Sequence, residues 1–135
     1  MKVLRSQALA AVCLSTLLVL PGCSDLMEPP PQLVGLWTAT SLTAGGQDEI
    51  ANGLQLSIRF NADNSYTITV NNDTIFYCEG ETNCTDEGEY EATASQITFD
   101  PGTEFEATAT YSISGDTMTF SGNFEGLSVQ ATLVR

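Results

Sequence analysis

Beyond Leu33, hydrophobic and polar residues alternate with a period of two. Apolar side chains occupy every second position from Leu54 to Phe60, and again from Leu127 to Leu133. Successive side chains of a β-strand point to opposite faces, so this pattern predicts strands that bury one face and expose the other. The same part of the chain shows no sustained helical period. We therefore expect an all-β domain.

The alternating runs are short, and residues that favour turns separate them. Gly, Asn, Asp, Ser and Pro gather in residues 61–65, 71–73, 100–103, 114–116 and 122–126. The predicted strands lie near residues 34–43, 53–61, 65–71, 74–78, 87–94, 96–100, 104–114, 116–122 and 127–135. The region 65–78 is predicted either as two strands or as one long bent strand. Eight or nine sequential strands joined by tight turns indicate a small antiparallel meander that closes into a barrel, with an open sandwich as the alternative.

The first 22 residues have the pattern of a secretory signal. Lys2 and Arg5 precede an apolar run over residues 8–20, which is too short to span a bilayer comfortably. The run ends in Leu20-Pro21-Gly22-Cys23, which resembles the lipobox of bacterial lipoproteins. The resemblance implies cleavage before Cys23 and acylation of that cysteine by fatty acids such as palmitate. An ordinary signal peptide or an N-terminal anchor helix is the alternative.

Residues 23–32 are predicted to connect the lipid to the folded domain. Two or more acyl chains hold a protein firmly on a membrane, and the prolines Pro29–Pro31 favour an extended spacer behind that anchor. By resemblance to lipoprotein sorting signals, Ser24 after Cys23 implies the outer membrane of a bacterial cell envelope. The expected domains are a signal peptide at 1–22, an anchor and linker at 23–32, and one barrel domain at 33–135.

The chain beyond Cys23 is strongly acidic. It keeps Arg59 and Arg135 as its basic residues against 17 acidic ones, and the whole sequence contains no histidine. Nucleic acids and anionic lipid surfaces are bound through Lys and Arg, so neither is an expected partner. Without histidine, lysine or a free thiol in this part, the usual general bases and nucleophiles are missing. We therefore expect a protein that is not an enzyme and holds no cofactor.

Cys78 and Cys84 are the cysteines that remain in the predicted barrel domain. Two thiolates without histidine do not complete a zinc site, and an expected location outside the cytoplasm favours a disulfide between them. The surrounding stretch YCEGETNCTDEGEY is acidic, so a calcium site is the alternative for this loop. It lacks the spacing of an EF-hand, and we predict no metal site.

The first predicted strand contains Gly35-Leu36-Trp37, and the chain ends on Arg135. Gly-x-Trp on the first strand and a late basic residue resemble the lipocalin-like domains of bacterial lipoproteins, and the stretch IRFNADNSYTI (58–68) resembles their second hairpin. The resemblance implies that Trp37 plugs the closed end of the barrel and that Arg135 packs across its indole. Such a cation–π contact stabilises a fold by about 1–2 kcal/mol.

Several small residues are expected on the inner face of the barrel. They are Ala92, Ala94, Ala107, Ala109 and Ala131. Small inward side chains either let a barrel close tightly or leave room for a guest. We expect a lipid-anchored envelope protein that binds a small apolar or amphipathic ligand, through residues that the sequence does not identify. The alternative is an interaction protein with a filled barrel, which contacts another envelope protein through its acidic surface.

Overall fold

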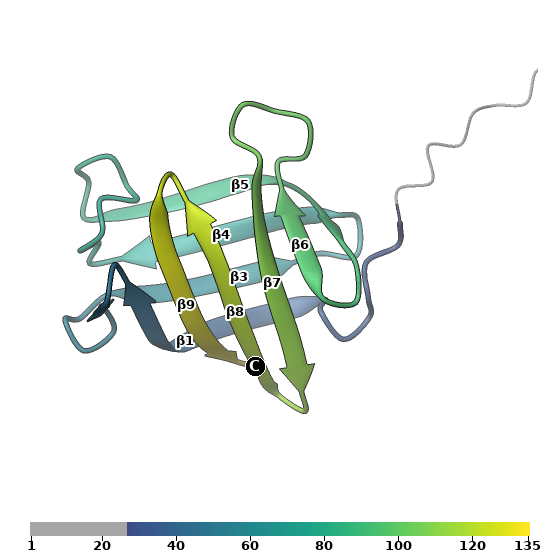
Figure 1. Ribbon diagram of the computed structural model, residues 1–135, viewed down its shortest axis with the longest axis horizontal. Helices are drawn as coiled ribbons and strands as arrows, with labels where there is room; N and C mark the ends of the chain where they lie inside the picture. The colour runs from purple at the N-terminus through teal and green to yellow at the C-terminus, as the bar shows by residue number, and fades with distance from the viewer. Residues whose placement is uncertain (1–26) are drawn as a thin grey trace, which may run out of the picture.

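The computed structural model describes residues 27–135, and every regular element in this range is a strand (Figure 1). The strands are β1 (Gly35–Ala44), β2 (Gln47–Asp48), β3 (Gln55–Phe60), β4 (Ser65–Asn71), β5 (Asn83–Ala92), β6 (Gln96–Phe99), β7 (Ala107–Ser114), β8 (Thr117–Phe124) and β9 (Leu127–Val134). No helix within the described range has the length and hydropathy needed to cross a membrane. The predicted signal peptide (1–22) and the predicted lipid site Cys23 lie outside the described residues.

The strands form one antiparallel meander that closes on itself. Each strand pairs with the next one in sequence, except that the short β2 folds back on the end of β1, so that β1 pairs with β3. The last strand, β9, returns to pair with β1 from Thr38 to Ala44. Every one of the eight barrel strands therefore has a neighbour on both sides, which confirms the predicted closed barrel and excludes the open sandwich.

The alternation in the sequence sorts side chains between the interior and the solvent. In β9, Val129, Ala131 and Leu133 are buried, whereas Ser128 and Gln130 are exposed. Edge-to-face aromatic contacts link one side of the core to the other. The aromatic side chains of the core are Trp37, Phe60, Tyr66, Tyr90, Phe99, Tyr111 and Phe120.

The segment between β4 and β5 differs from the prediction. Residues 72–82 form a loop of turns and bends, so the predicted strand at 74–78 and the alternative of one long bent strand are both wrong. The carboxylate of Asp73 explains the difference, because it accepts hydrogen bonds from the backbone N–H groups of Ile75 (2.9 Å) and Cys78 (2.8 Å). These bonds offer the backbone an alternative to a strand ladder. β5 accordingly begins at Asn83 rather than at residue 87.

The predicted strand 104–114 begins later than expected, and Ala94 does not face the interior. Phe105 is 71% exposed, because β7 begins at Ala107 and residues 100–106 form a loop. In that loop the Gly102 N–H donates to the Glu106 carboxylate (2.7 Å). Ala94 is exposed because it lies in the turn between β5 and β6.

The connections between strands gather at two ends of the barrel. Residues 61–64, 93–95 and 115–116 lie at one end, where the chain also enters through residues 27–34; we call it the closed end. Residues 45–54, 72–82, 100–106 and 125–126 lie at the opposite end, which we call the open end (Figure 1).

Candidate binding site at the open end of the barrel

The closed end is sealed from solvent. Five core side chains have no exposed surface, and all of them lie in the closed-end half of the barrel: Leu33, Trp37, Ile97, Met118 and Leu133. Residues 29–32, which the sequence predicts as part of a spacer, lie against this end. Pro29 is buried, and the Leu33 N–H donates to the Pro30 carbonyl (2.8 Å).

Trp37 and Arg135 meet at this end. The indole N–H of Trp37 donates to the carbonyl of Leu33 (2.8 Å), and the Arg135 guanidinium carbon lies 4.8 Å from the indole centroid. Arg135 also donates to the Gln32 carbonyl (3.0 Å) and lies 3.4 Å from an oxygen of Asp116. Because the Arg135 side chain is 32% exposed and Trp37 is fully buried, the guanidinium covers the indole from the solvent side.

At the open end part of the core is incompletely covered, although Leu42, Leu54 and Val70 there are at most 2% exposed. Six apolar side chains there pack against the core but keep some exposed surface: Ile50, Leu56, Ile75, Cys84, Phe124 and Leu127. A barrel that is sealed at one end and loosely covered at the other has one natural entrance to its apolar interior. The open end is therefore the candidate site.

The interior below this entrance is filled by aromatic rings. Phe124 stacks on Phe120, with ring centroids 5.9 Å apart, and also contacts Phe99. Gly122 makes room for Phe124, because a Cβ at Gly122 would lie 2.9 Å from that ring and 3.0 Å from Ala109. The small residues at 109 and 122 thus let β7 and β8 approach closely and do not line an empty cavity.

Two tyrosine–carboxylate pairs stand at the open end. Tyr66 donates to Asp100 (2.7 Å), and Tyr77 donates to Asp86 (2.8 Å). Burial of the hydroxyl and then the hydrogen bond to its carboxylate raise the pKa of each tyrosine, and the negative charge of the other pair's carboxylate raises it further. The four side chains therefore form one electrostatic cluster, in which the raised pKa values keep both tyrosine hydroxyls protonated as hydrogen-bond donors.

Gly88 on β5 is what allows the first of these pairs to form. Gly88 is paired with Tyr66 in the register of β4 and β5. A Cβ at Gly88 would lie 2.1 Å from an oxygen of Asp100 and 2.8 Å from the Tyr66 ring and hydroxyl. Any larger residue would push the carboxylate and the ring apart.

The disulfide between Cys78 and Cys84 is confirmed, and it ties the 72–82 loop to β5. Cys84 lies inside β5 and Cys78 lies in the preceding loop, so the bond joins a loop to a strand. Cys78 is buried, and Thr74 of the same loop donates to the buried Glu49 (2.6 Å). The loop is therefore fastened at several points.

The acidic stretch around the disulfide gives the calcium alternative no support. Among residues 27–135, no group of three or more Cys, Asp and Glu side chains is placed to hold a metal ion.

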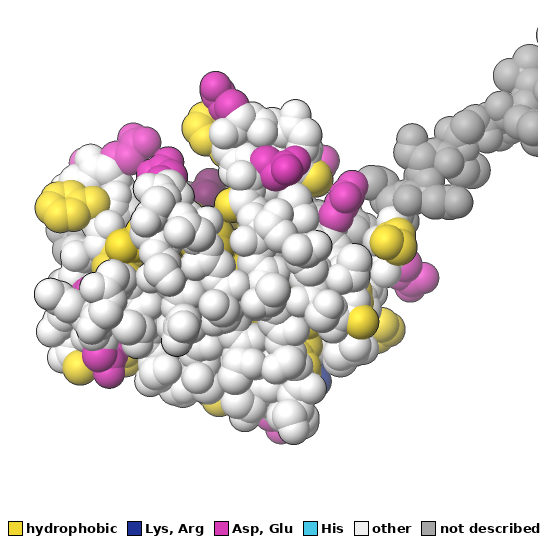
Figure 2. Space-filling view, viewed as in Figure 1, with side chains coloured by type: hydrophobic (Ala, Val, Ile, Leu, Met, Phe, Trp, Pro, Cys, Tyr) yellow, Lys and Arg dark blue, Asp and Glu magenta, His cyan; other side chains and the backbone are white. Residues whose placement is uncertain are grey.

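The outer wall differs from the open end in its chemistry. β1, β6, β7, β8 and β9 contain no charged residue, and Figure 2 shows their surface almost free of acidic side chains, which gather at the loops. A hollow of about 460 Å³ lies on this wall, and the outward side chains that line it are Ser41, Thr43, Thr110, Ser112, Thr119, Ser121, Gln130 and Thr132. A second hollow of about 370 Å³ lies beside Met27. Neither lies inside the barrel.

The sequence did not single out the polar cluster at the open end. Asp86 and Gly88 share the parity of the buried Tyr90 on β5, so a carboxylate and a glycine on an otherwise apolar inner face were a usable signal. Reading that signal requires β5 to begin at Asn83, whereas the alternation predicts a start at residue 87. Tyr77 and Asp100 lie outside the strands, where no periodicity identifies them.

These features define a small up-and-down β-barrel whose core is sealed at one end and partly covered at the other. A family model described as the lipocalin-like domain matches residues 33–120, a range that includes Trp37 and the two tyrosine–carboxylate pairs. The chain therefore belongs to the lipocalin-like domain family. The searches of curated proteins and of solved structures gave no match.

Proposed function

We propose that this protein binds a small apolar or amphipathic molecule at the open end of its barrel. The observation that carries the proposal is the contrast between the two ends, since the core is sealed around Trp37 and only partly covered around Phe124 and Leu127. Membership of the lipocalin-like family supports it, because a barrel of this kind suggests a small hydrophobic ligand.

The apolar part of the ligand enters by displacing the ring of Phe124. This ring is half-buried and lies over Gly122, so its movement opens space without breaking the strand ladder. The polar part of the ligand then lies near Asp86 and Asp100. Because this end is rich in acidic side chains and has no Lys or Arg in its loops, an amine head group suits it better than a carboxylate head group.

A matched pair of probes tests the proposal. Dodecylamine and laurate share an alkyl chain and carry opposite charges, and their binding is measured by calorimetry with the purified protein. We expect the amine to bind more tightly. Phe124→Ala should strengthen its binding, because the ring no longer has to be displaced, whereas Thr119→Ser on the outer wall should change nothing. If neither probe binds the native protein or the Phe124→Ala variant, the proposal is wrong.

We also propose that Cys23 anchors the protein in a bacterial cell envelope, at the outer membrane. The lipobox resemblance supports this, and the place where the chain enters the barrel would set its orientation. The Asn64 side-chain amide donates to the Met27 carbonyl (3.3 Å) at the closed end. An extended residue spans at most about 3.6 Å, so a lipid on Cys23 would hold the closed end near the bilayer and leave the open end facing away.

Labelling of cells with radioactive palmitate tests the anchor. The native protein should take up the label and sediment with the membranes, whereas Cys23→Ala should do neither. Equal labelling of both proteins, or none in the native protein, would contradict the proposal.

A further inference from the structure

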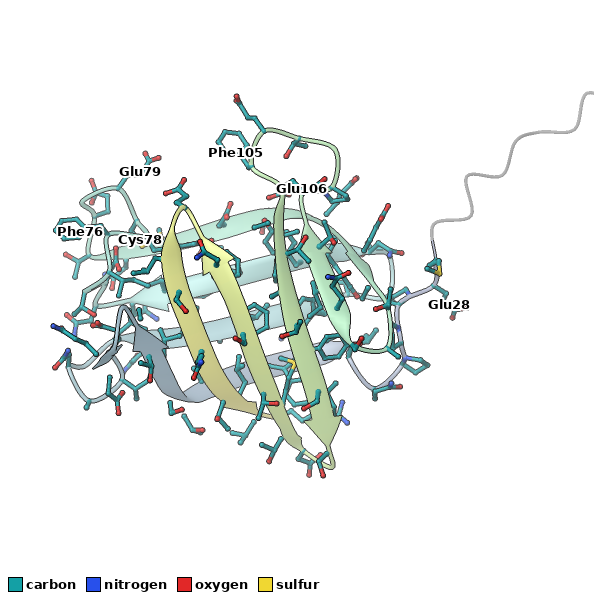
Figure 3. The ribbon with its side chains drawn as sticks, in the orientation of Figure 1. Glu28, Phe76, Cys78, Glu79, Phe105 and Glu106 are labelled. Carbon is teal, nitrogen blue, oxygen red and sulfur yellow. A yellow bond between two sulfur atoms is a disulfide. The ribbon has the colours of Figure 1, made fainter. Side chains whose placement is uncertain are left out.

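Two phenylalanines at the open end are exposed to solvent. Phe76, in the loop 72–82, is 84% exposed, and Phe105, in the loop 100–106, is 71% exposed. Figure 3 shows the two rings on separate loops of the same end, with Glu79 and Glu106 beside them. An exposed aromatic ring adds nothing to the stability of the core, and two on neighbouring loops are typical of an interaction surface.

The loop that carries Phe76 holds it in an unfavourable conformation. Phe76 has a φ of 62°, a left-handed backbone that residues with a bulky side chain rarely adopt. Three contacts fix the loop around it: the Cys78–Cys84 disulfide, the hydrogen bonds accepted by Asp73, and the bond from Tyr77 to Asp86. The ring is thus presented to solvent by a rigid loop, which lowers the entropy lost when a partner binds.

The charge around these rings has one sign. The four segments of the open end contain no Lys or Arg. The two basic residues of the described chain lie near the closed end: Arg59 near the end of β3, and Arg135 directly after β9. The acidic residues of the open-end segments are Asp48, Glu49, Asp73, Glu79, Glu81, Asp100, Glu104, Glu106 and Glu125. A partner with basic residues around an apolar one is complementary to this surface.

We propose that the loops 72–82 and 100–106 bind a basic, apolar segment of another protein, with Phe76 and Phe105 as its two anchors. The inference does not depend on the small-ligand proposal, because these rings are exposed and contribute nothing to the core. A second copy of this chain does not fit, because two open ends would bring like charges together. An anionic membrane is repelled for the same reason.

Two labelled peptides test the proposal by fluorescence anisotropy. Both are short amphipathic peptides with the same leucines, one with lysines and the other with glutamates. We expect the lysine peptide to bind the purified protein, with an affinity that falls as salt is raised, and the glutamate peptide not to bind. Sedimentation of the protein with zwitterionic vesicles, or its self-association, in place of peptide binding would overturn the proposal.

Substitutions locate the surface. Phe76→Asn and Phe105→Ser should each weaken binding of the lysine peptide about tenfold or more. Leu36→Ser is the matched control, since Leu36 is an exposed hydrophobic residue (43%) of the first barrel strand near the closed end. Glu79→Gln should reduce both affinity and salt dependence, while Glu28→Gln at the closed end should not (Figure 3).

The asparagine variant also separates binding from folding. Asn adopts the left-handed backbone more readily than Phe, so Phe76→Asn should keep or raise the melting temperature while binding of the lysine peptide weakens. If Phe76→Asn binds the lysine peptide as tightly as the native protein does, Phe76 is not an anchor and the proposal fails.

Discussion

At the scale of single residues, hydrogen-bonded tyrosines at both ends of the barrel make its stability depend on pH. The structure gives a hydrogen-bond acceptor to every tyrosine hydroxyl: Tyr66 donates to Asp100, Tyr77 to Asp86, Tyr90 to the Asn61 carbonyl (2.8 Å) and Tyr111 to the Thr93 carbonyl (2.6 Å). Burial, as the largest cause, raises the pKa of all four, and that of Tyr90 to about 12. The folded protein therefore keeps its phenolic protons up to a higher pH than the unfolded chain does.

This difference predicts that the protein loses stability in alkali. An unfolded tyrosine has a pKa of about 10, so above about pH 10 the unfolded chain releases protons that the folded one retains, and the free energy of unfolding falls as pH rises. Urea unfolding between pH 8 and pH 12 measures it. Tyr90→Phe should cost about 1 kcal/mol at pH 8 and make the alkaline decline less steep. Equal stability at both ends of this range would contradict the assignment.

A second prediction at this scale concerns Gly88. Gly88→Ala should destabilise the protein by about 1–3 kcal/mol, because the added methyl group overlaps Asp100 and Tyr66. Denaturant unfolding measures the cost. The same substitution in an Asp100→Ala background should cost less, because the nearest clashing atom is gone. Equal costs in both backgrounds would show that the strain lies elsewhere.

At the scale of elements, the loop 72–82 is irregular but is held by the disulfide and by hydrogen bonds of Asp73 and Tyr77. A loop closed over a sequence separation of 6 gains about 2 kcal/mol from the lost entropy of the unfolded chain. We expect the double substitution Cys78→Ala and Cys84→Ala to lower the free energy of unfolding by about that amount, measured with denaturant. The native protein should respond in the same way to a reductant. No change would mean that Asp73 and Tyr77 alone hold the loop.

The elements also show what the sequence predicts well and what it does not. β3, β4, β8 and β9 lie close to their predicted ranges, because two-residue periodicity reports directly on which face is buried. The loop 72–82 escaped prediction because Asp73, a side chain outside the alternation, takes over backbone N–H groups. Phe105 is in phase with the apolar residues of β7, so the alternation predicts it as part of that strand, although the strand begins only at Ala107.

At the scale of the whole molecule, charge, burial of the core and backbone conformation all differ between the two ends of the barrel. The sealed end carries Arg135 over Trp37, whereas the open end carries acidic loops, exposed phenylalanines and a partly covered core. Strained backbone follows the same axis: the non-glycine residues with positive φ at the open end are Asn72, Phe76, Glu79, Asp100 and Glu125, and Asn64 is at the closed end. The composition predicts an acidic protein, but only the topology shows that the acidic loops meet at one end.

The most direct test of the account is an NMR titration of the backbone amides of the purified protein with dodecylamine. Binding at the open end predicts shift changes concentrated in residues 45–54, 72–82, 100–106 and 122–127, with Trp37 and Arg135 unchanged. Changes concentrated at the closed end or on the uncharged outer wall, or no changes at all, would contradict the claim that the open end of this barrel is its binding end.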